Sequence, residues 1–221
     1  MYSLPYFKEK EAAVVRAFME QHPFITLCGS DADGNPVATH VPVLLREEND
    51  TLFLHGHIMK KTDHHLAFVQ NPNVLAVFTG PHTYVSASWY SNPLSGSTWN
   101  YMTVHAKGIM KFLDEPALLD LLRDLTAKFE NNPDSPALFD KLPSEYISQM
   151  SKAIVAFAIE VKEIDNVFKL SQNRDETSYH TIIEKLEQQG GDAKIIAGEM
   201  SKRAAKLFSE KAVTTKAAGH E

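Results

Sequence analysis

GPHTYVSASWYSNPLSGSTWNYMTVHAKG, the stretch from Gly80 to Gly108, carries most of the information in this chain. It holds both tryptophans of the protein among tyrosines, histidines and an asparagine, and two strand-like runs flank a loop rich in Ser, Asn, Pro and Gly. Aromatic rings interleaved with N–H and O–H donors suit a flat, partly polar ligand, whereas a plain core strand would supply Val, Ile and Leu. The alternative is an aromatic cluster packed under a long loop, and composition alone allows both.

The size and composition of the chain are those of a soluble globular protein. Its 221 residues can bury a real core, and 43% are hydrophobic and 23% charged. The single cysteine, Cys28, rules out an internal disulfide framework and fits a reducing compartment, so we expect a cytoplasmic location. No apolar run is long enough to span a membrane, and the net charge of −6 argues against broad electrostatic binding to nucleic acid.

The hydrophobic pattern predicts strands in hairpin order, interrupted by short helices. Gly34 supplies the positive φ of the first hairpin turn, and Gly80-Pro81 is expected to close a strand. This order favours an α+β fold built on a closed antiparallel barrel over a parallel sheet, and no Gly-rich nucleotide loop is present. The predicted strands are 24–29, 37–46, 51–57, 74–79, 99–113 and 154–167, and the predicted helices are 9–22, 60–70, 115–130, 144–151, 176–188 and 193–211.

The domain organisation follows from a change of character after the last predicted strand. Residues 1–174 are expected to form the barrel domain with its peripheral helices. Residues 175–213 read as a C-terminal helical extension that buries little, and residues 214–221 as a disordered tail.

The segment ATHVPVLL, residues 38–45, is the first candidate binding segment. His40 and Pro42 interrupt an otherwise clean strand. A proline removes a backbone donor from the sheet, so it belongs at an edge, at a bulge or where a ligand approaches the backbone. An edge strand protected by proline explains the pattern equally well.

The segment LHGHIMKKTDHH, residues 54–65, is the second candidate. A strand ends at His57 and a helix begins near Lys60 to Thr62. The unpaired N–H groups of a helix start, two lysines and the Thr62 hydroxyl would form a phosphate-binding corner. The alternative is a solvated lysine pair.

The same segment is rich in histidine, which raises the question of a metal site. His55 and His57 would share one face of a strand, as zinc ligands do. However, two adjacent lysines repel a divalent cation, and neither HExxH nor a nearby cysteine is present. We therefore predict no metal and interpret the histidines as surface or supporting residues.

Two further segments border the barrel end. In TWNYMTVH, residues 98–105, Trp99, Tyr101 and Thr103 would point to one face while Asn100 and its alternating partners point to the other. KLSQNR, residues 169–174, gathers polar side chains where a barrel mouth would lie. The alternative for KLSQNR is the cap of the following helix, supplied by Ser171 or Asn173.

These segments together resemble one known family. MYSLPYF at the N-terminus, ATHVPVLL, LHGHIMK, GPHTYVSASWY, TWNYMTVHAKG and KLSQNR occur in the order found in the PaiB family, bacterial proteins known as FMN-binding negative transcriptional regulators. The resemblance extends from Met1 to about Arg174. It implies an FMN-binding antiparallel split β-barrel, related to pyridoxamine-phosphate oxidases and flavin reductases, that forms a homodimer with two flavin sites at the subunit interface.

The resemblance also implies which residues hold FMN. Oxidase relatives carry an Arg-Lys phosphate pair where this chain has Lys61-Thr62, which weakens a bidentate clamp. The arginines that bind substrate phosphate in those oxidases have no clear counterpart here, so activity on a B6 vitamer is not implied. The implied FMN residues are His40, Val41 and Pro42 at the isoalloxazine edge, His57, Ile58, Lys60, Lys61 and Thr62 at the phosphate, and Trp99, Asn100, Tyr101 and Thr103 from the partner chain.

Three functions are compatible with such a flavin site. The first is a cytoplasmic FMN-binding regulator whose contact with DNA is weak or indirect, because no helix-turn-helix is recognisable. Its only basic stripe lies near the C-terminus, at Lys194, Lys202, Arg203, Lys206 and Lys211. The second is a flavin-dependent oxidoreductase or flavin reductase, which needs few catalytic side chains because the cofactor carries the chemistry. The third is a haem-binding or haem-degrading split barrel, which the histidines keep open.

Overall fold

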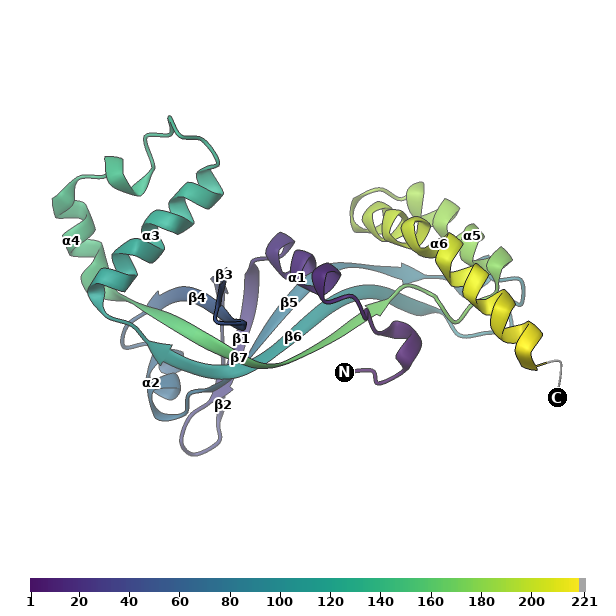
Figure 1. Cartoon of the computed structure of the whole chain (residues 1–221), viewed down its shortest axis with the longest axis horizontal. Helices are drawn as coiled ribbons and strands as arrows, with labels where there is room; N and C mark the ends of the chain where they lie inside the picture. Colours follow the sequence, from purple (N-terminus) through teal and green to yellow (C-terminus); the bar gives the residue numbers. More distant parts are fainter. Residues whose placement is uncertain (219–221) are drawn as a thin grey trace. The chain divides into compact units, whose positions relative to one another are not determined.

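Seven strands form one antiparallel sheet in the computed structural model, which describes the backbone of residues 1–218 and the side chains of residues 1–209 (Figure 1). The strand order is β2-β1-β5-β6-β7-β4-β3, which confirms the predicted α+β split-barrel class. The strands are β1 (Phe24–Ser30), β2 (Pro36–Pro42), β3 (Leu44–Glu48), β4 (Thr51–Met59), β5 (Asn73–Val85), β6 (Thr98–Phe112) and β7 (Ile154–Lys169).

The two strands at the ends of this order are consecutive in the chain. Only Val43 separates β2 from β3, and its N–H donates to the carbonyl of Pro23 at 2.9 Å. β2 pairs with β1, with Thr26 opposite His40, whereas β3 pairs with β4, with Leu44 opposite His55. The chain therefore closes the sheet through one sharply bent segment, although β2 and β3 do not pair with each other.

The helices begin and end close to the predicted positions. α2 starts at Asp63 and not at Lys60, because Thr62 caps it and Lys61 has a positive φ of 64°. The α-helices are α1 (Ala12–Gln21), α2 (Asp63–Gln70), α3 (Glu115–Glu130), α4 (Ser144–Ala153), α5 (Glu176–Glu187) and α6 (Gly191–Ala218), and three 3-10 turns are η1 (Pro5–Phe7), η2 (Ala87–Trp89) and η3 (Phe139–Lys141).

The predicted end of a strand at Gly80-Pro81 is wrong, because β5 continues through both residues to Val85. The pairing of β5 with β1 covers Leu75 to Val77 only. Pro81 lies beyond this pairing, where its missing N–H removes no bond to β1. Gly34 has the predicted positive φ, at 85°.

Gly108 lies inside β6, where the neighbouring strand β7 approaches closely. A Cβ at this position would lie 2.6 Å from Cγ2 of Ile159 and would clash with the backbone oxygen of Glu160. Glycine is therefore required by the close approach of β7.

The chain divides into two compact units. Unit 1 comprises Met1–Val15, Thr79–Thr103 and residues 166–221, and unit 2 comprises Arg16–Phe78 and Val104–Asp165. In unit 2, Leu118, Leu121 and Leu125 of α3 pack in one cluster with Leu44 and Ala156 of the sheet. Their spacing of three and four residues places all three leucines on one face of α3.

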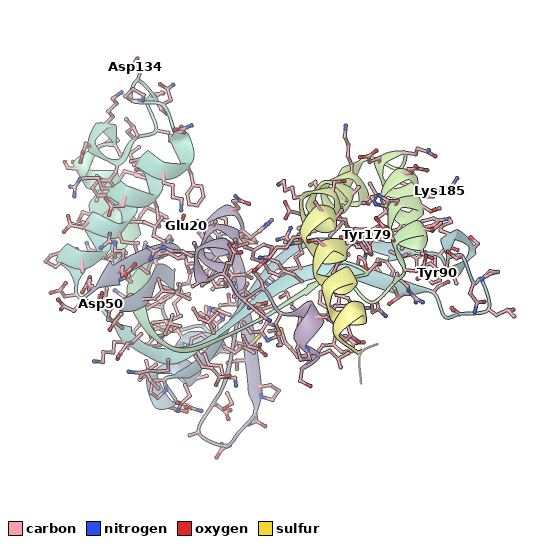
Figure 2. The ribbon with its side chains drawn as sticks, turned by 45° about the vertical axis from the view of Figure 1, so that its right-hand side comes forward. Glu20, Asp50, Tyr90, Asp134, Tyr179 and Lys185 are labelled. Carbon is pink, nitrogen blue, oxygen red and sulfur yellow. The ribbon has the colours of Figure 1, made fainter. Side chains whose placement is uncertain are left out.

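The C-terminal helices contribute a substantial core to unit 1, so the prediction that they bury little is wrong. Tyr179 (labelled in Figure 2) is fully buried, and its hydroxyl donates to the carbonyl of Met200 at 3.0 Å. The predicted tail begins inside α6, which ends at Ala218, and residues 219–221 lie outside the described residues. The other fully buried apolar side chains of α5 and α6 are Ile182, Leu186, Ile196, Ala197 and Met200.

Candidate functional site

The end of β4 and the start of α2 form a cationic corner in unit 2, which we call the Lys61 corner (His57 to Thr62). Lys61 is exposed, and its left-handed backbone turns the chain from the strand into the helix. Thr62 then caps α2: its hydroxyl accepts from the N–H of His65 at 3.3 Å and donates to the carbonyl of Met59 at 3.1 Å. The local sequence thus places two adjacent lysines at a helix start, as predicted.

Several backbone donors at and just after this corner are already used within the protein. The N–H of Lys61 donates to Nδ1 of His65 at 3.3 Å, and the N–H of His64 donates to the Asp63 carboxylate at 2.8 Å. The Asp63 carboxylate also adds negative charge to the first turn. An incoming phosphate would therefore depend on the lysine ammonium groups more than on the helix N–H groups.

Of the two lysines, Lys61 is the better placed for an anion. The N–H of Lys60 donates to the carbonyl of Ala153 at 2.8 Å, and Lys60 lines a pocket of about 120 Å³. Asp114 and Glu115 line the same pocket, and their negative charges oppose an anion there. Lys61 does not line this pocket, so Asp114 and Glu115 do not oppose an anion at Lys61.

The candidate segment on β2 lies beside β4 within unit 2. A methyl group at Gly56 would lie 3.1 Å from the carbonyl oxygen of Pro42 and 2.6 Å from the ring of Phe157. Glycine at position 56 therefore lets the end of β2 approach β4 closely, directly before His57. Val41 is buried and Pro42 half-buried, whereas His40 is exposed beside the ring of Phe24. The structure thus brings the predicted ring-edge segment next to the predicted phosphate segment.

His57 is the most distinctive polar group of this region. Its Nδ1 atom is buried and has no hydrogen-bond partner among residues 1–209, although the side chain as a whole is half-buried. Burial lowers the pKa of His57, so the imidazole is neutral at pH 7 and can offer or accept one hydrogen bond. The neighbouring side chain of Ile58 is buried, so only its backbone is available to a ligand.

An aromatic face formed by the end of β5 and the start of β6 lies in unit 1, and we call it the Trp99 face (Tyr84, Trp99 and Tyr101). Trp99 is 53% exposed and its ring packs edge-on against Tyr84, itself 48% exposed, at 6.0 Å. Tyr101 and Thr103 are half-buried, in the alternation that the sequence predicted. Burial, followed by the proximity of Tyr2, raises the pKa of the Tyr101 hydroxyl, which therefore stays a neutral donor.

Asn100 lies on the opposite side of β6 from the Trp99 face. Its side chain is fully buried, accepts from the Ser171 hydroxyl at 3.1 Å and contacts the sulfur of Met200 at 3.5 Å. The structure therefore does not bring this side chain together with Trp99 and Tyr101. Asn100 instead ties β6 to KLSQNR and to α6.

KLSQNR does not cap α5 through Ser171 or Asn173, because Asp175 is the cap. The Asp175 carboxylate accepts from the N–H of Ser178 at 2.9 Å and from the Ser91 hydroxyl at 2.9 Å. These hydrogen bonds, of which the one from the Ser178 hydroxyl has the largest effect, lower the pKa of Asp175 to about 2.

Lys169 is a candidate binding residue that the sequence pattern did not single out. Its ammonium donates to the Thr98 hydroxyl and, at 3.0 Å, to the carbonyl of Trp99. Burial, followed by repulsion from Arg174, lowers its pKa. The sequence indicated only that Lys169 belongs to the polar segment KLSQNR. Its partners Thr98 and Trp99 are about 70 residues away in the chain, so they could not be predicted from neighbouring residues.

Each region meets a chemical requirement of a flavin mononucleotide. The Lys61 corner supplies cations for a phosphate, and His57 supplies a hydrogen-bonding atom that no group in residues 1–209 uses. The Trp99 face supplies exposed rings for a planar heterocycle. The residues present therefore fit FMN.

Other site types find less support in the described part of the chain. Among residues 1–209, whose side chains are described, no three His, Cys, Asp or Glu side chains are grouped so that they could hold a metal ion. None of the helices within residues 1–218 combines the length and the apolar character that crossing a membrane requires.

Comparison with known proteins gives the family. Residues 1–163 match the family described as "Putative FMN-binding domain". The chain is 36% identical over 189 residues to the Protease synthase and sporulation protein PAI 2 of Bacillus subtilis, with 86% of this chain and 90% of that protein covered.

Solved structures share the fold at low sequence identity. The FAD and heme binding protein of Mycobacterium smegmatis superposes with a TM-score of 0.55 at 18% identity, covering 74% of this chain and 73% of that one. The flavocytochrome Anf3 of Azotobacter vinelandii superposes with a TM-score of 0.51 at 14% identity, covering 76% and 72%. Because the family match spans most of the chain and the PAI 2 protein is similar over nearly its whole length, this chain belongs to the PaiB family of proteins with an FMN-binding domain.

Proposed function

We propose that this protein is a cytoplasmic, FMN-binding negative transcriptional regulator that acts as a homodimer. In this proposal the Lys61 corner of one chain and the Trp99 face of its partner hold one flavin at the subunit interface. The observation that carries the proposal is the open Trp99 face, where Trp99 of β6 and Tyr84 of β5 are each about half exposed. Uncovered rings of this size favour a ligand or a partner surface over bulk water.

The roles of the residues follow from their surroundings. Lys61 would meet the phosphate as a point charge, and the neutral imidazole of His57 would fix one polar atom of the cofactor. Val41 and Pro42 would pack along the ring edge, and the partner's Trp99 face would cover the ring. FMN, when bound, supplies one- and two-electron transfer, so the flavin state can serve as the signal.

The basic stripe near the C-terminus supports an indirect route to transcription. Lys202 and Arg203 both pair with Glu199, and Lys206 pairs with Glu11 at 3.2 Å. A DNA phosphate would have to displace these carboxylates. Lys211 lies outside the described side chains.

A mixing experiment tests whether one site is shared by two chains. Lys61→Ala and Trp99→Ala proteins are prepared separately and then unfolded and refolded together. A heterodimer with shared sites contains one site free of both substitutions and one site with both. Flavin titration should therefore recover high-affinity sites in the mixture, up to one site per heterodimer.

Two results would contradict the proposal. If every site lay within one chain, each chain of the mixture would still carry one defect and no high-affinity site would appear. If light scattering showed a monomer with FMN still bound, the homodimer model would be wrong. Rapid oxidation of NADH by the purified flavoprotein would favour the oxidoreductase alternative.

A further inference from the structure

Lys169 is a half-buried cation that has no carboxylate partner in the part of the chain with described side chains. In residues 1–209, its hydrogen bonds go only to the Thr98 hydroxyl and the Trp99 carbonyl, both neutral, and no Asp or Glu side chain forms an ion pair with it. Burying a charge without an opposite charge is unfavourable, so such a lysine usually has a reason to be retained.

The surroundings of Lys169 are aromatic. Its ammonium lies 5.8 Å from the ring centre of Tyr2 and 6.0 Å from that of Phe7. Tyr2 is 50% exposed and lies close enough to Tyr101 to raise its pKa, and the ammonium donates to the backbone carbonyl of Trp99, so the cation lies at the edge of the Trp99 face. A planar ligand on that face would find the ammonium near its edge.

The ammonium group of Lys169 has one N–H donor that no hydrogen bond within residues 1–209 uses. An ammonium group has three N–H donors, and the two neutral acceptors take two of them. A second cation that repels Lys169, Arg174, lies over the ring of Tyr90 at 3.9 Å and also donates to the carbonyl of Gly96. One remaining N–H in an aromatic setting suits a carbonyl or ring nitrogen better than it suits a phosphate dianion.

We infer that Lys169 binds the acceptor edge of the isoalloxazine ring of the flavin, and so recognises the ring and not the phosphate. This inference rests on the proposed function, because the ring is that of the flavin bound at the Trp99 face. It divides the recognition of FMN into two separable parts: Lys61 for the phosphate and Lys169 for the ring. Riboflavin, which has the ring but no phosphate, separates the two.

The binding experiment uses the full-length protein and both flavins. Lys169→Met keeps the length of the side chain and removes the charge, and Lys169→Arg restores a charged donor. We expect Lys169→Met to weaken riboflavin and FMN by the same factor, roughly tenfold, and Lys169→Arg to recover part of the loss. Lys194→Met is the matched control, because Lys194 is an exposed lysine of the same unit.

Each other outcome has one meaning. Weakening of FMN alone would place Lys169 at the phosphate, and unchanged affinity for both flavins would make it a structural cation; both overturn the inference. If the wild-type protein bound neither flavin, the proposed function itself would fail.

A labelling experiment covers the case in which Lys169→Met does not fold. Wild-type protein is pulsed with acetic anhydride with and without saturating riboflavin, and acetylation is measured at each lysine by mass spectrometry. We expect riboflavin to reduce acetylation of Lys169 several-fold and to leave Lys194 unchanged. Equal acetylation of Lys169 in both samples would overturn the inference.

Discussion

Replacing Lys61 by alanine should weaken FMN binding without weakening the fold. A charge-assisted hydrogen bond contributes roughly 1.5–3 kcal/mol. Lys61 is exposed and Asp63 stands nearby, so the lower end of this range applies, which corresponds to about a tenfold higher Kd. The backbone N–H of Lys61 already bonds to His65, so the substitution should remove the side-chain contact and little else.

The left-handed backbone of Lys61 provides a control. Alanine and lysine are equally strained at a φ of 64°, so Lys61→Ala should change the unfolding free energy by less than about 0.5 kcal/mol. Lys61→Gly relieves the strain, so it should lose FMN affinity while its thermal midpoint does not fall. Loss of binding together with unchanged or higher stability cannot come from damage to the fold.

Flavin fluorescence titrations with FMN and riboflavin measure the effect. The affinity for riboflavin should stay within a factor of two in both variants, because riboflavin lacks the phosphate. A fall in riboflavin affinity as large as the fall in FMN affinity would refute the assignment of Lys61 to the phosphate.

Three further predictions concern stability, pH and DNA. Gly108→Ala should lower the free energy of unfolding in urea by about 2–3 kcal/mol, because its methyl group would meet the Glu160 backbone. Gly198→Ala has open space around it in α6 and should raise the free energy of unfolding by up to about 1 kcal/mol. Equal effects of the two substitutions would contradict the close-packing argument. Burial lowers the folded-state pKa of His57, so the unfolded chain takes up this proton first and stability should fall as pH drops below the unfolded value of about 6.5. Urea unfolding between pH 7.5 and 5 should show a shallower decline in His57→Gln, and identical slopes would refute the role of His57. Binding of DNA near physiological salt should be no tighter than about 1 μM and should weaken further with salt, as measured by fluorescence anisotropy; tight, sequence-specific binding at that salt would overturn the indirect route.

The sequence predicted those features that depend on neighbours along the chain. The alternation from Trp99 to Val104 fixed which side chains of β6 share a face, because the period of a strand is two. The positive φ of Gly34 was predicted for the same reason, since turn chemistry is local.

The features that the sequence did not predict depend on distant segments. Asn100 and Met200 meet across 100 residues of chain, so the burial of α6 could not be inferred from its own modest apolar pattern. Pro81 could remain within β5 only because the pairing with β1 ends earlier. The environment of Lys169 is assembled from Tyr2, Phe7 and Trp99, so a lysine that is polar in sequence becomes half-buried in the fold.

The segments of unit 1 also determine when the protein can finish folding during synthesis. All of unit 2 lies before residue 166, whereas unit 1 needs Met1–Val15, Thr79–Thr103 and the residues from 166 onward. At roughly 5–20 residues per second, the ribosome needs about 2–7 seconds to add the stretch from Asn166 to Met200. Until Met200 leaves the exit tunnel, the amide of Asn100 lacks its contact with the Met200 sulfur and Tyr179 lacks its carbonyl acceptor. The strand segment that carries Trp99 and Asn100 therefore stays without these contacts until Met200 has been synthesised. A chaperone that binds nascent chains would be most useful to the protein during this interval.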